Sequence, residues 1–235
     1  MRLNLLLSSN GICSRRKADE IILSGRVQVN NKIVLAPYFR VNESDIISLD
    51  GKKISSSPAE IQRVYYIINK PRGYVCAVSD KYDPVIIDLL PKEPRIFPVG
   101  RLDKDSEGLL ILTNDGNFAQ NIIHPSKKIS REYEVTLNQP LNDTHLLRWR
   151  KGFEIESKFV KPLRIKQLSP EKLIITLSEG IKREIRLMAR QMGFRVERLI
   201  RVKIGGLELG NLKPGEYESL SFSSLCNKIF SNSRT

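Results

Sequence analysis

Residues 99–116 read VGRLDKDSEGLLILTNDG and join an acidic turn to an apolar run. Asp103, Asp105 and Glu107 occupy alternate positions, a glycine follows at once, and the run Leu109–Leu112 comes next. A short continuous apolar run between turn residues predicts a buried strand. Three acids therefore stand at the entrance to a core element, in a chain whose formal net charge is +13.

Two of three interpretations of this acidic stretch remain open on the residues alone. The spacing D-x-D-x-E-G resembles the start of an EF-hand loop, but position 12 would be Asn114, which cannot supply a bidentate carboxylate. The stretch can instead be a polar turn in which Asp105 and Glu107 are solvated. Alternatively, Asp103 is held rigidly where a loop meets the strand and acts as a nucleophile toward a sugar carbon, with nearby arginines keeping it ionised.

Beyond residue 62 the pattern is one of mixed strands and helices. Strands are predicted over residues 64–69, 109–113, 132–137 and 172–178, and helices near residues 116–123, 142–150 and 181–192. Because regular βαβ alternation is missing, we predict an α+β domain with a mostly antiparallel mixed sheet flanked by helices. This domain is expected to span residues 62–222, and residues 223–235 are expected to fray as a C-terminal tail.

Residues 1–50 read as a separate small unit that begins with two helices. Leucines at positions 3, 6 and 7 recur at helical spacing, and Ser14 is a good N-cap for a second helix that Gly25 ends. Short strands are predicted over residues 26–31, 32–35 and 45–49, with a tight turn at Asn30-Asn31. The polar, serine-rich stretch 51–61 contains a proline and is predicted to be a linker.

The composition points to a polyanionic partner. Lysine and arginine total 39 against 26 aspartates and glutamates, and the isoelectric point is near 9.7, which favours nucleic acid over membrane. The longest apolar runs are too short for a membrane span or a signal peptide, so a cytoplasmic protein is expected. Cys13, Cys76 and Cys226 are too far apart for a metal site and are expected to be reduced thiols in or near cores. Two histidines exclude a histidine-rich metal site, and no P-loop, GxGxxG, HExxH or GxSxG motif is present.

Two basic clusters carry most of the argument for nucleic acid. The first would form one face of the N-terminal unit, has no matching acids in the sequence pattern, and comprises Arg2, Arg15, Arg16, Lys17, Arg26 and Lys32. The second falls on one side of the helix near residues 181–192 and comprises Lys182, Arg183, Arg186 and Arg190. Ile185, Met188 and Met192 fall on the other side of that helix and are expected in the core. The alternative for both clusters is a solvated surface without a partner.

Several longer motifs occur together and in order along the chain. They are INKPRG (68–73), VGRLDKDSEGLLILTNDG (99–116), HPSKKISREYEV (124–135), EGIKREIRLM (179–188) and RLIRVKIGGLELGNLKPGEY (198–217). The set resembles the RsuA/RluB-type ribosomal RNA pseudouridine synthases. Residues 1–34 resemble the S4 RNA-binding domain, an αL-like module that precedes the catalytic domain in that family. The resemblance covers nearly the whole chain.

The resemblance implies a reaction and a set of site residues. Uridine in RNA is isomerised to pseudouridine without a cofactor: the N1–C1′ bond breaks, the base rotates, and C5 bonds to C1′. The essential aspartate would be Asp103, which attacks the ribose or stabilises a glycal-type intermediate. Tyr133 would stack on the target base, and Arg186 would pair with the aspartate. Residues expected to contact or shape the substrate site are Lys70, Arg101, Arg183 and Leu199, of which Leu199 would pack near the base.

The resemblance also implies a partner and leaves one alternative. The substrate would be ribosomal RNA or a pre-ribosomal particle, with large-subunit RNA preferred over small-subunit RNA, and the protein would act as a monomer. Two positions depart from the family pattern: Ser106 stands where threonine is usual, and Leu187 replaces a common arginine. The alternative is a non-catalytic S4-type RNA-binding or ribosome-assembly factor, against which the intact set Asp103, Tyr133 and Arg186 argues.

Overall fold

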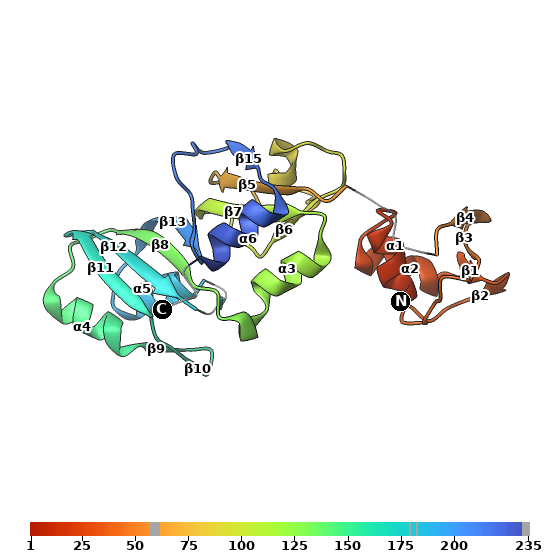
Figure 1. Cartoon of the computed structure of the whole chain (residues 1–235). Helices are drawn as coiled ribbons and strands as arrows, with labels where there is room; N and C mark the ends of the chain where they lie inside the picture. The colour runs from red at the N-terminus through yellow and green to blue at the C-terminus, as the bar shows by residue number, and fades with distance from the viewer. Residues whose placement is uncertain (57–61, 179, 182, 232–235) are drawn as a thin grey trace. The chain divides into compact units, whose positions relative to one another are not determined.

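The computed structural model describes residues 1–56, 62–178, 180–181 and 183–231. The chain divides into two compact units, Met1–Gln62 and Arg63–Thr235 (Figure 1). No helix within the described ranges is both long and apolar enough to cross a membrane. The three cysteines are partly buried thiols.

The first unit packs two helices on a small antiparallel sheet. Its elements are α1 (Leu3–Ser9), α2 (Arg15–Leu23), β1 (Val27–Val29), β2 (Lys32–Ile33), β3 (Ile47–Leu49) and β4 (Lys52–Ile54), with strand order β2-β1-β3-β4. As predicted, the Ser14 side chain caps α2 by accepting from the Lys17 N–H. Asn30 and Asn31 both have positive φ, which asparagine tolerates and a tight hairpin turn needs. Leu6, Ile22 and Val27 are among the fully buried residues of this unit's core.

The predicted linker over residues 51–61 is wrong at its start. Residues 52–54 form β4, which pairs with β3 through Leu49↔Lys52 and Ile47↔Ile54. The segment therefore completes the sheet of the first unit, because the apolar Ile54 packs against its core. The remainder of the predicted linker, residues 57–61, lies outside the described residues.

The second unit is built on a nine-stranded sheet. Its strands are β5 (Tyr65–Lys70), β6 (Phe97–Val99), β7 (Glu107–Thr113), β8 (Arg131–Leu137), β11 (Arg164–Ser169), β12 (Lys172–Leu177), β13 (Val196–Ile204), β14 (Leu207–Glu208) and β15 (Tyr217–Ser219). The order is β11-β12-β8-β13-β7-β5-β15, with β6 also on β7 and β14 also on β13. A separate hairpin joins β9 (Phe153–Ile155) and β10 (Lys158–Val160). Only the β7–β13 pair is parallel among the described strands, so the predicted mostly antiparallel α+β fold is confirmed.

Helical elements pack on both faces of this sheet. The helical elements are η1 (Ile86–Leu89), α3 (Gly116–Ile123), η2 (Pro125–Lys127), α4 (Asp143–Lys151), α5 (Glu184–Gln191) and α6 (Phe222–Phe230). Side chains of β7 alternate: Leu109 and Ile111 pack with residues of α3 and α6, while Leu110 and Leu112 pack with residues of η1. All seven residues of β7 are buried, which agrees with the strand predicted over residues 109–113.

The predicted C-terminal tail is largely wrong, because residues 222–230 form α6. The Ser221 side chain caps the helix by accepting from the Ser224 N–H. Leu225 and Ile229 are 0% and 1% exposed and belong to the core beside α3. Apolar residues spaced three and four apart already carried this signal in the sequence, and burying them fixes the helix in place.

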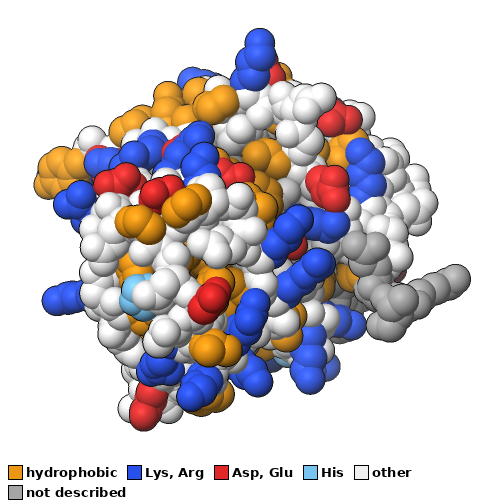
Figure 2. Space-filling model, turned by 90° about the vertical axis from the view of Figure 1, so that its left-hand side faces the viewer, with side chains coloured by type: hydrophobic (Ala, Val, Ile, Leu, Met, Phe, Trp, Pro, Cys, Tyr) orange, Lys and Arg blue, Asp and Glu red, His pale blue; other side chains and the backbone are white. Residues whose placement is uncertain are grey.

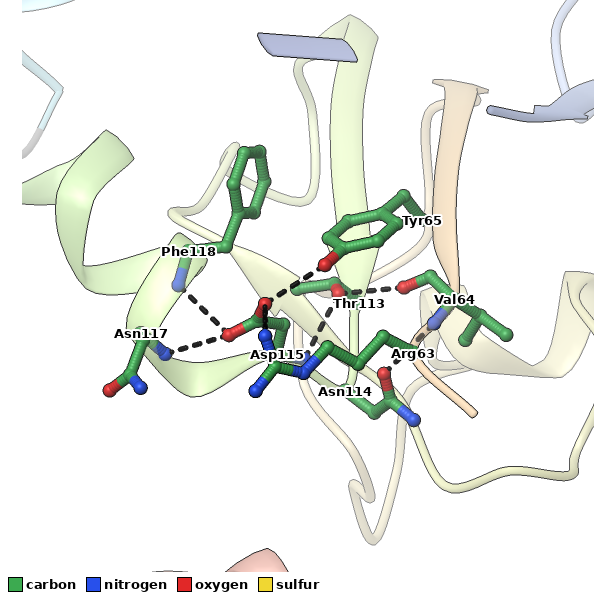
Figure 3. Close-up of polar contacts among 8 residues, drawn as sticks. All are labelled: Arg63, Val64, Tyr65, Thr113, Asn114, Asp115, Asn117 and Phe118. Carbon is green, nitrogen blue, oxygen red and sulfur yellow. Dashed lines mark hydrogen bonds and ion pairs between the residues drawn. The ribbon is translucent and has the colours of Figure 1, made fainter. Parts of the chain in front are cut away.

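A buried carboxylate ties the far end of β7 to β5 and α3 (Figure 3). Asp115 accepts from the N–H groups of Asn117 and Phe118 at 3.0 Å each, which caps α3. It also accepts from the Tyr65 hydroxyl at 2.9 Å and pairs with Arg63 at 3.2 Å. Burial, reinforced by Asp115, raises the pKa of Tyr65 to about 12. The network fixes the start of β5 against the end of the strand whose other end carries the acidic stretch.

Candidate active site

A cleft of about 940 Å³ opens in the second unit where β8, β13 and the loop before β7 meet. It is lined by the segments 99–103, 122–125 and 128–129, and by Ser106, Arg131, Tyr133, Lys158, Leu163, Ser178, Gly180, Ile181, Arg183, Glu184, Ile185, Leu199, Arg201 and Ile204. A volume of this size lies at the upper end of those found for small-molecule sites.

Asp103 lies on the loop between β6 and β7 and faces the cleft with its side chain 31% exposed. Its carbonyl accepts from the Ser106 N–H at 3.0 Å, which closes a tight turn. Gly100, just before this loop, has φ +77, a conformation that glycine adopts without strain. The loop therefore presents one partly exposed carboxylate from a rigid support.

Gly108 explains why a glycine must follow the acids. It has φ +107, and a Cβ at this position would lie 2.3 Å from the carbonyl oxygen of Arg201. The register Arg201↔Gly108 belongs to the parallel β7–β13 pair. The backbone of β13 can approach this closely only where a side chain is missing. The approach brings Leu199 and Arg201 of β13 next to the Asp103 loop.

Tyr133 and Leu199 both line the cleft, from the neighbouring strands β8 and β13. In the β8–β13 register Tyr133 is opposite Arg201, and Leu199 is opposite Val135. Tyr133 is 9% exposed and Leu199 is 6% exposed, so both form an apolar wall. An aromatic ring and a leucine beside a carboxylate make a suitable surface for a flat base that has left its stack.

Lys70 is not placed to contact a substrate, so that prediction is wrong. Its side chain is 0% exposed, and its ammonium donates to the carbonyls of Pro71 at 3.0 Å and Ser106 at 2.6 Å. Burial lowers the pKa of Lys70, while Cys76 and the acids around Asp103 act in the opposite direction. The lysine holds the backbone of the acidic turn from behind.

The ion pair predicted between Arg186 and Asp103 is not the one that forms. Arg186 contacts the Asp105 carboxylate at 3.3 Å and the Asp105 carbonyl at 3.1 Å, and it donates to the Val196 carbonyl at 3.0 Å. Burial lowers the pKa of Arg186, and Asp105 opposes that effect. The cation that faces Asp103 is Arg183, whose guanidinium lies 4.0 Å from it.

Arg183 lies just before α5 rather than on it, and its guanidinium is 4.0 Å from the Asp103 carboxylate and 3.6 Å from that of Asp105. The helix runs over Glu184–Gln191, and Arg183 adopts the left-handed conformation with φ 57 as its N-cap. The predicted stripe of four cations on one helix face is therefore wrong for Arg183, and Lys182 lies outside the described residues. Ile185 and Met188 are buried as predicted.

Cations outnumber acids around the cleft. The lining includes six of them, namely Arg101, Lys128, Arg131, Lys158, Arg183 and Arg201, against the two carboxylates Asp103 and Glu184. Arg101 is exposed at the rim, as a residue that meets substrate should be. On the face seen in Figure 2, lysine and arginine side chains are also far more frequent than aspartate and glutamate. Such a surface attracts a polyanion.

The basic residues of the first unit divide into two groups. Arg2, Arg15, Arg16 and Lys32 have no acidic partner in the described parts of the chain, as the phosphate-binding prediction requires. The prediction that acids are missing is wrong for the other two, since Lys17 pairs with Glu20 at 2.7 Å and Arg26 pairs with Asp50. Both pairs are about half exposed, so each contributes little stability and can be exchanged for a phosphate.

A metal site has no support from the described side chains, since no three or more His, Cys, Asp or Glu among them are grouped so as to hold an ion. The titratable side chains that line the cleft are two carboxylates, one histidine, one tyrosine and a set of guanidinium and ammonium groups.

Comparisons with known proteins agree with this geometry. The family model described as RNA pseudouridylate synthase matches residues 64–191, and the S4 domain model matches residues 1–47. The chain belongs to the RNA pseudouridine synthase family. An "Uncharacterized RNA pseudouridine synthase" of Aquifex aeolicus is 40% identical over 96% of this chain and 92% of its own length. The "Dual-specificity RNA pseudouridine synthase RluF" of Shigella flexneri is 35% identical over 99% of this chain and 80% of its own length.

A solved structure also matches nearly the whole chain. The crystal structure of a pseudouridylate synthase has a TM-score of 0.71 and 28% identity, and the match covers 97% of this chain and 99% of that one. The resemblance drawn from the motifs is thus confirmed for the family, for the S4 domain and for the fold. The RNA pseudouridine synthase described here is an isomerase that acts on RNA.

Proposed function

We propose that this RNA pseudouridine synthase converts a specific uridine of ribosomal RNA to pseudouridine, with Asp103 as the nucleophile and large-subunit RNA as the preferred substrate. The observation that carries the proposal is the cleft in which the Asp103 carboxylate, the Tyr133 ring and Leu199 are brought together from three strands or loops. The preference for large-subunit RNA rests on the overall sequence character of the S4 and linker segments.

The proposed chemistry needs one carboxylate on the sugar side and one ring on the base side. Asp103 attacks C1′, or stabilises the glycal-type intermediate, as the N1–C1′ bond breaks and the electron pair passes to the base. The detached base rotates against Tyr133, and C5 bonds to C1′ as the bond between Asp103 and C1′ breaks and releases the carboxylate; on the glycal-type route the proton lost from C2′ returns to C2′ instead. C5 then loses its proton while N1 regains one, so the product is an isomer and no cofactor is consumed.

Binding energy must compensate for extraction of the base. Removing a nucleotide from a stack costs a few kcal/mol. The six cations of the cleft and the basic face of the first unit can supply that energy through phosphate contacts, which makes binding strongly salt-dependent. The Arg183 guanidinium also lines the cleft and lies 4.0 Å from the Asp103 carboxylate.

The test is to map pseudouridine in ribosomal RNA after incubation with the protein. Transcripts of each ribosomal RNA and pre-ribosomal particles are treated, modified chemically and read by primer extension. The wild type and the control Asp143→Ala, an exposed acid on α4 outside the cleft, should produce one new pseudouridine. Asp103→Ala should produce none while its RNA affinity stays within about two-fold of the wild type, since a cleft that stays basic overall still binds phosphate.

Two outcomes would overturn the proposal. Product formed by Asp103→Ala would remove the carboxylate from the mechanism. No product from the wild type on any ribosomal RNA or particle, together with tight RNA binding, would favour a non-catalytic S4-type RNA-binding or ribosome-assembly factor. A modified position in small-subunit RNA would reverse only the substrate preference.

A further inference from the structure

Two arginines on the floor of the cleft have no carboxylate partner within the described residues. Arg131, at the start of β8, donates only to the carbonyls of Ile129 at 3.2 Å and Ile122 at 3.4 Å. Arg201, on β13, donates to the carbonyls of Leu109 at 2.8 Å and Arg101 at 3.5 Å. Each is hydrogen-bonded to main-chain oxygens, and neither forms an ion pair with a carboxylate of the described residues, although Glu184 acts on the charge of Arg131 from a longer distance.

Burial of these two positive charges is energetically unfavourable unless an anion is bound. Arg201 is 2% exposed, and one of its terminal nitrogens, Nη2, is buried without a hydrogen-bond partner. Burial lowers the pKa of Arg131, the charge of Arg201 lowers it further, and Tyr133 and Glu184 oppose these effects. Two like charges removed from water near one another are unfavourable unless an anion joins them.

The size and position of the site suit a phosphodiester. Arg131 lies two residues before Tyr133 on β8, about 7 Å along the strand, which is within the span of one nucleotide. Lys128 and Lys158 line the same cleft and add positive charge at its rim. The cleft of about 940 Å³ has room for more than one nucleoside. A planar guanidinium also binds phosphate oxygens in pairs.

We infer that Arg131 and Arg201 form an anion-binding subsite that receives the phosphodiester next to the target nucleotide. The inference rests on the proposed function, since it assumes that RNA enters the cleft. Arg131 contacts the phosphate, because it is partly exposed to the cleft, and Arg201 supports it from the buried side with its charge. The subsite would hold the backbone beside the extracted base and set how deeply the base enters.

The experiment neutralises the phosphate and the arginine separately and together. The substrate is an RNA oligonucleotide around the mapped uridine, in which a methylphosphonate replaces one phosphodiester at a time. Methylphosphonate replacement at one particular linkage should lower the kcat/KM of the wild type by about ten- to a hundred-fold, as expected for loss of a charged hydrogen bond. Arg131→Met should show the same loss on unmodified RNA and no further loss on that modified RNA.

Controls separate a phosphate contact from a structural role. Arg150 is an exposed arginine on α4 outside the cleft. The control Arg150→Met should therefore lose as much kcat/KM as the wild type when methylphosphonate replaces the linkage to which the wild type is sensitive. Arg131→Lys keeps the charge and should recover part of the activity. If Arg131→Met fails to fold, as its thermal midpoint would reveal, Arg131→Lys and Arg131→Gln enter the same cycle. Arg201 is left intact because it is too deeply buried to replace safely.

The outcomes distinguish this inference from the proposed function. If the wild type modifies every methylphosphonate substrate at the same rate, the subsite is overturned and the function stands. If the arginine and phosphate effects multiply, the two groups act independently and the subsite is also overturned. If the wild type modifies none of the RNAs, including the unmodified one, both fall together.

Discussion

The pairing of Arg186 with Asp105 rather than Asp103 leads to a stability measurement that can refute it. The perturbations are Arg186→Gln, Asp105→Asn and Asp103→Asn, alone and in pairs. Arg186 is 12% exposed and Asp105 41% exposed, and their nearest side-chain atoms are 3.3 Å apart. Arg186 also donates to the carbonyls of Asp105 and Val196, and these contacts do not depend on either carboxylate.

The expected magnitudes follow from this geometry. At an effective dielectric constant of about 20, two charges 3.3 Å apart attract by roughly 5 kcal/mol before desolvation is counted. Exposure of Asp105 screens much of that attraction, so the net pair should contribute about 1 kcal/mol. Arg186→Gln should cost more, about 2–4 kcal/mol, because two charged hydrogen bonds to carbonyls are weakened as well.

The assay is urea unfolding of each variant at pH 7, at low and high salt. The Arg186–Asp105 cycle should give a coupling of about 1 kcal/mol in the free energy of unfolding, reduced at high salt. The Arg186–Asp103 cycle should give a coupling near zero. A larger coupling for Asp103 than for Asp105 would refute the reasoning and restore the pair that the family resemblance implies.

Three further predictions concern the support of the site. Gly108→Ala should lower the free energy of unfolding by about 2–5 kcal/mol, because its Cβ would overlap the Arg201 backbone at a φ of +107; circular dichroism during urea titration measures it. Removal of the chain from Phe222 onward should cost roughly 3–6 kcal/mol, since it strips α6 from the core, and an unchanged urea midpoint would contradict that packing. Tyr65 has its pKa raised to about 12, so its neutral form stabilises the fold below pH 10 and that contribution is lost as pH rises toward 12. Tyr65→Phe should therefore lose less stability than the wild type between pH 10 and 12 in the same titration, and parallel curves would contradict the assignment.

Local patterns predicted the elements that are decided by neighbouring residues. The helix near residues 116–123 forms over Gly116–Ile123, because an aspartate cap and helical apolar spacing act within one segment. The turn at Asn30-Asn31 is also decided locally, because asparagine tolerates the positive φ that both residues adopt. Burial alternation in β8 also follows directly from the alternating residues of its sequence.

Features decided by distant segments could not be predicted in the same way. The linker boundary was misplaced because β4 is defined by its pairing with β3, which a polar local composition hides. The fate of Lys70 depends on carbonyls that come from the acidic turn more than thirty residues later. The strand Val196–Ile204 is not among the strands predicted from the sequence, because its apolar residues do not alternate regularly with its charged ones. Its parallel pairing with β7 is a tertiary property.

The acidic stretch and the basic segment after residue 182 make sense only as a matched pair. Asp103 faces Arg183, Asp105 is held by Arg186, and Glu107 is bound by Arg198 at 2.9 Å. Two acids of the loop and the first residue of β7 thus meet arginines just before α5, on α5 and on β13, and Arg183 also lies 3.6 Å from Asp105, which aligns the two segments along the cleft. The three ion pairs differ in their distance and geometry. The Glu107 pair is close and bidentate, whereas the Asp103 pair is the longest, at 4.0 Å. The two inner pairs therefore fix the loop, and the outermost carboxylate is the least restrained of the three, which suits the role proposed for Asp103.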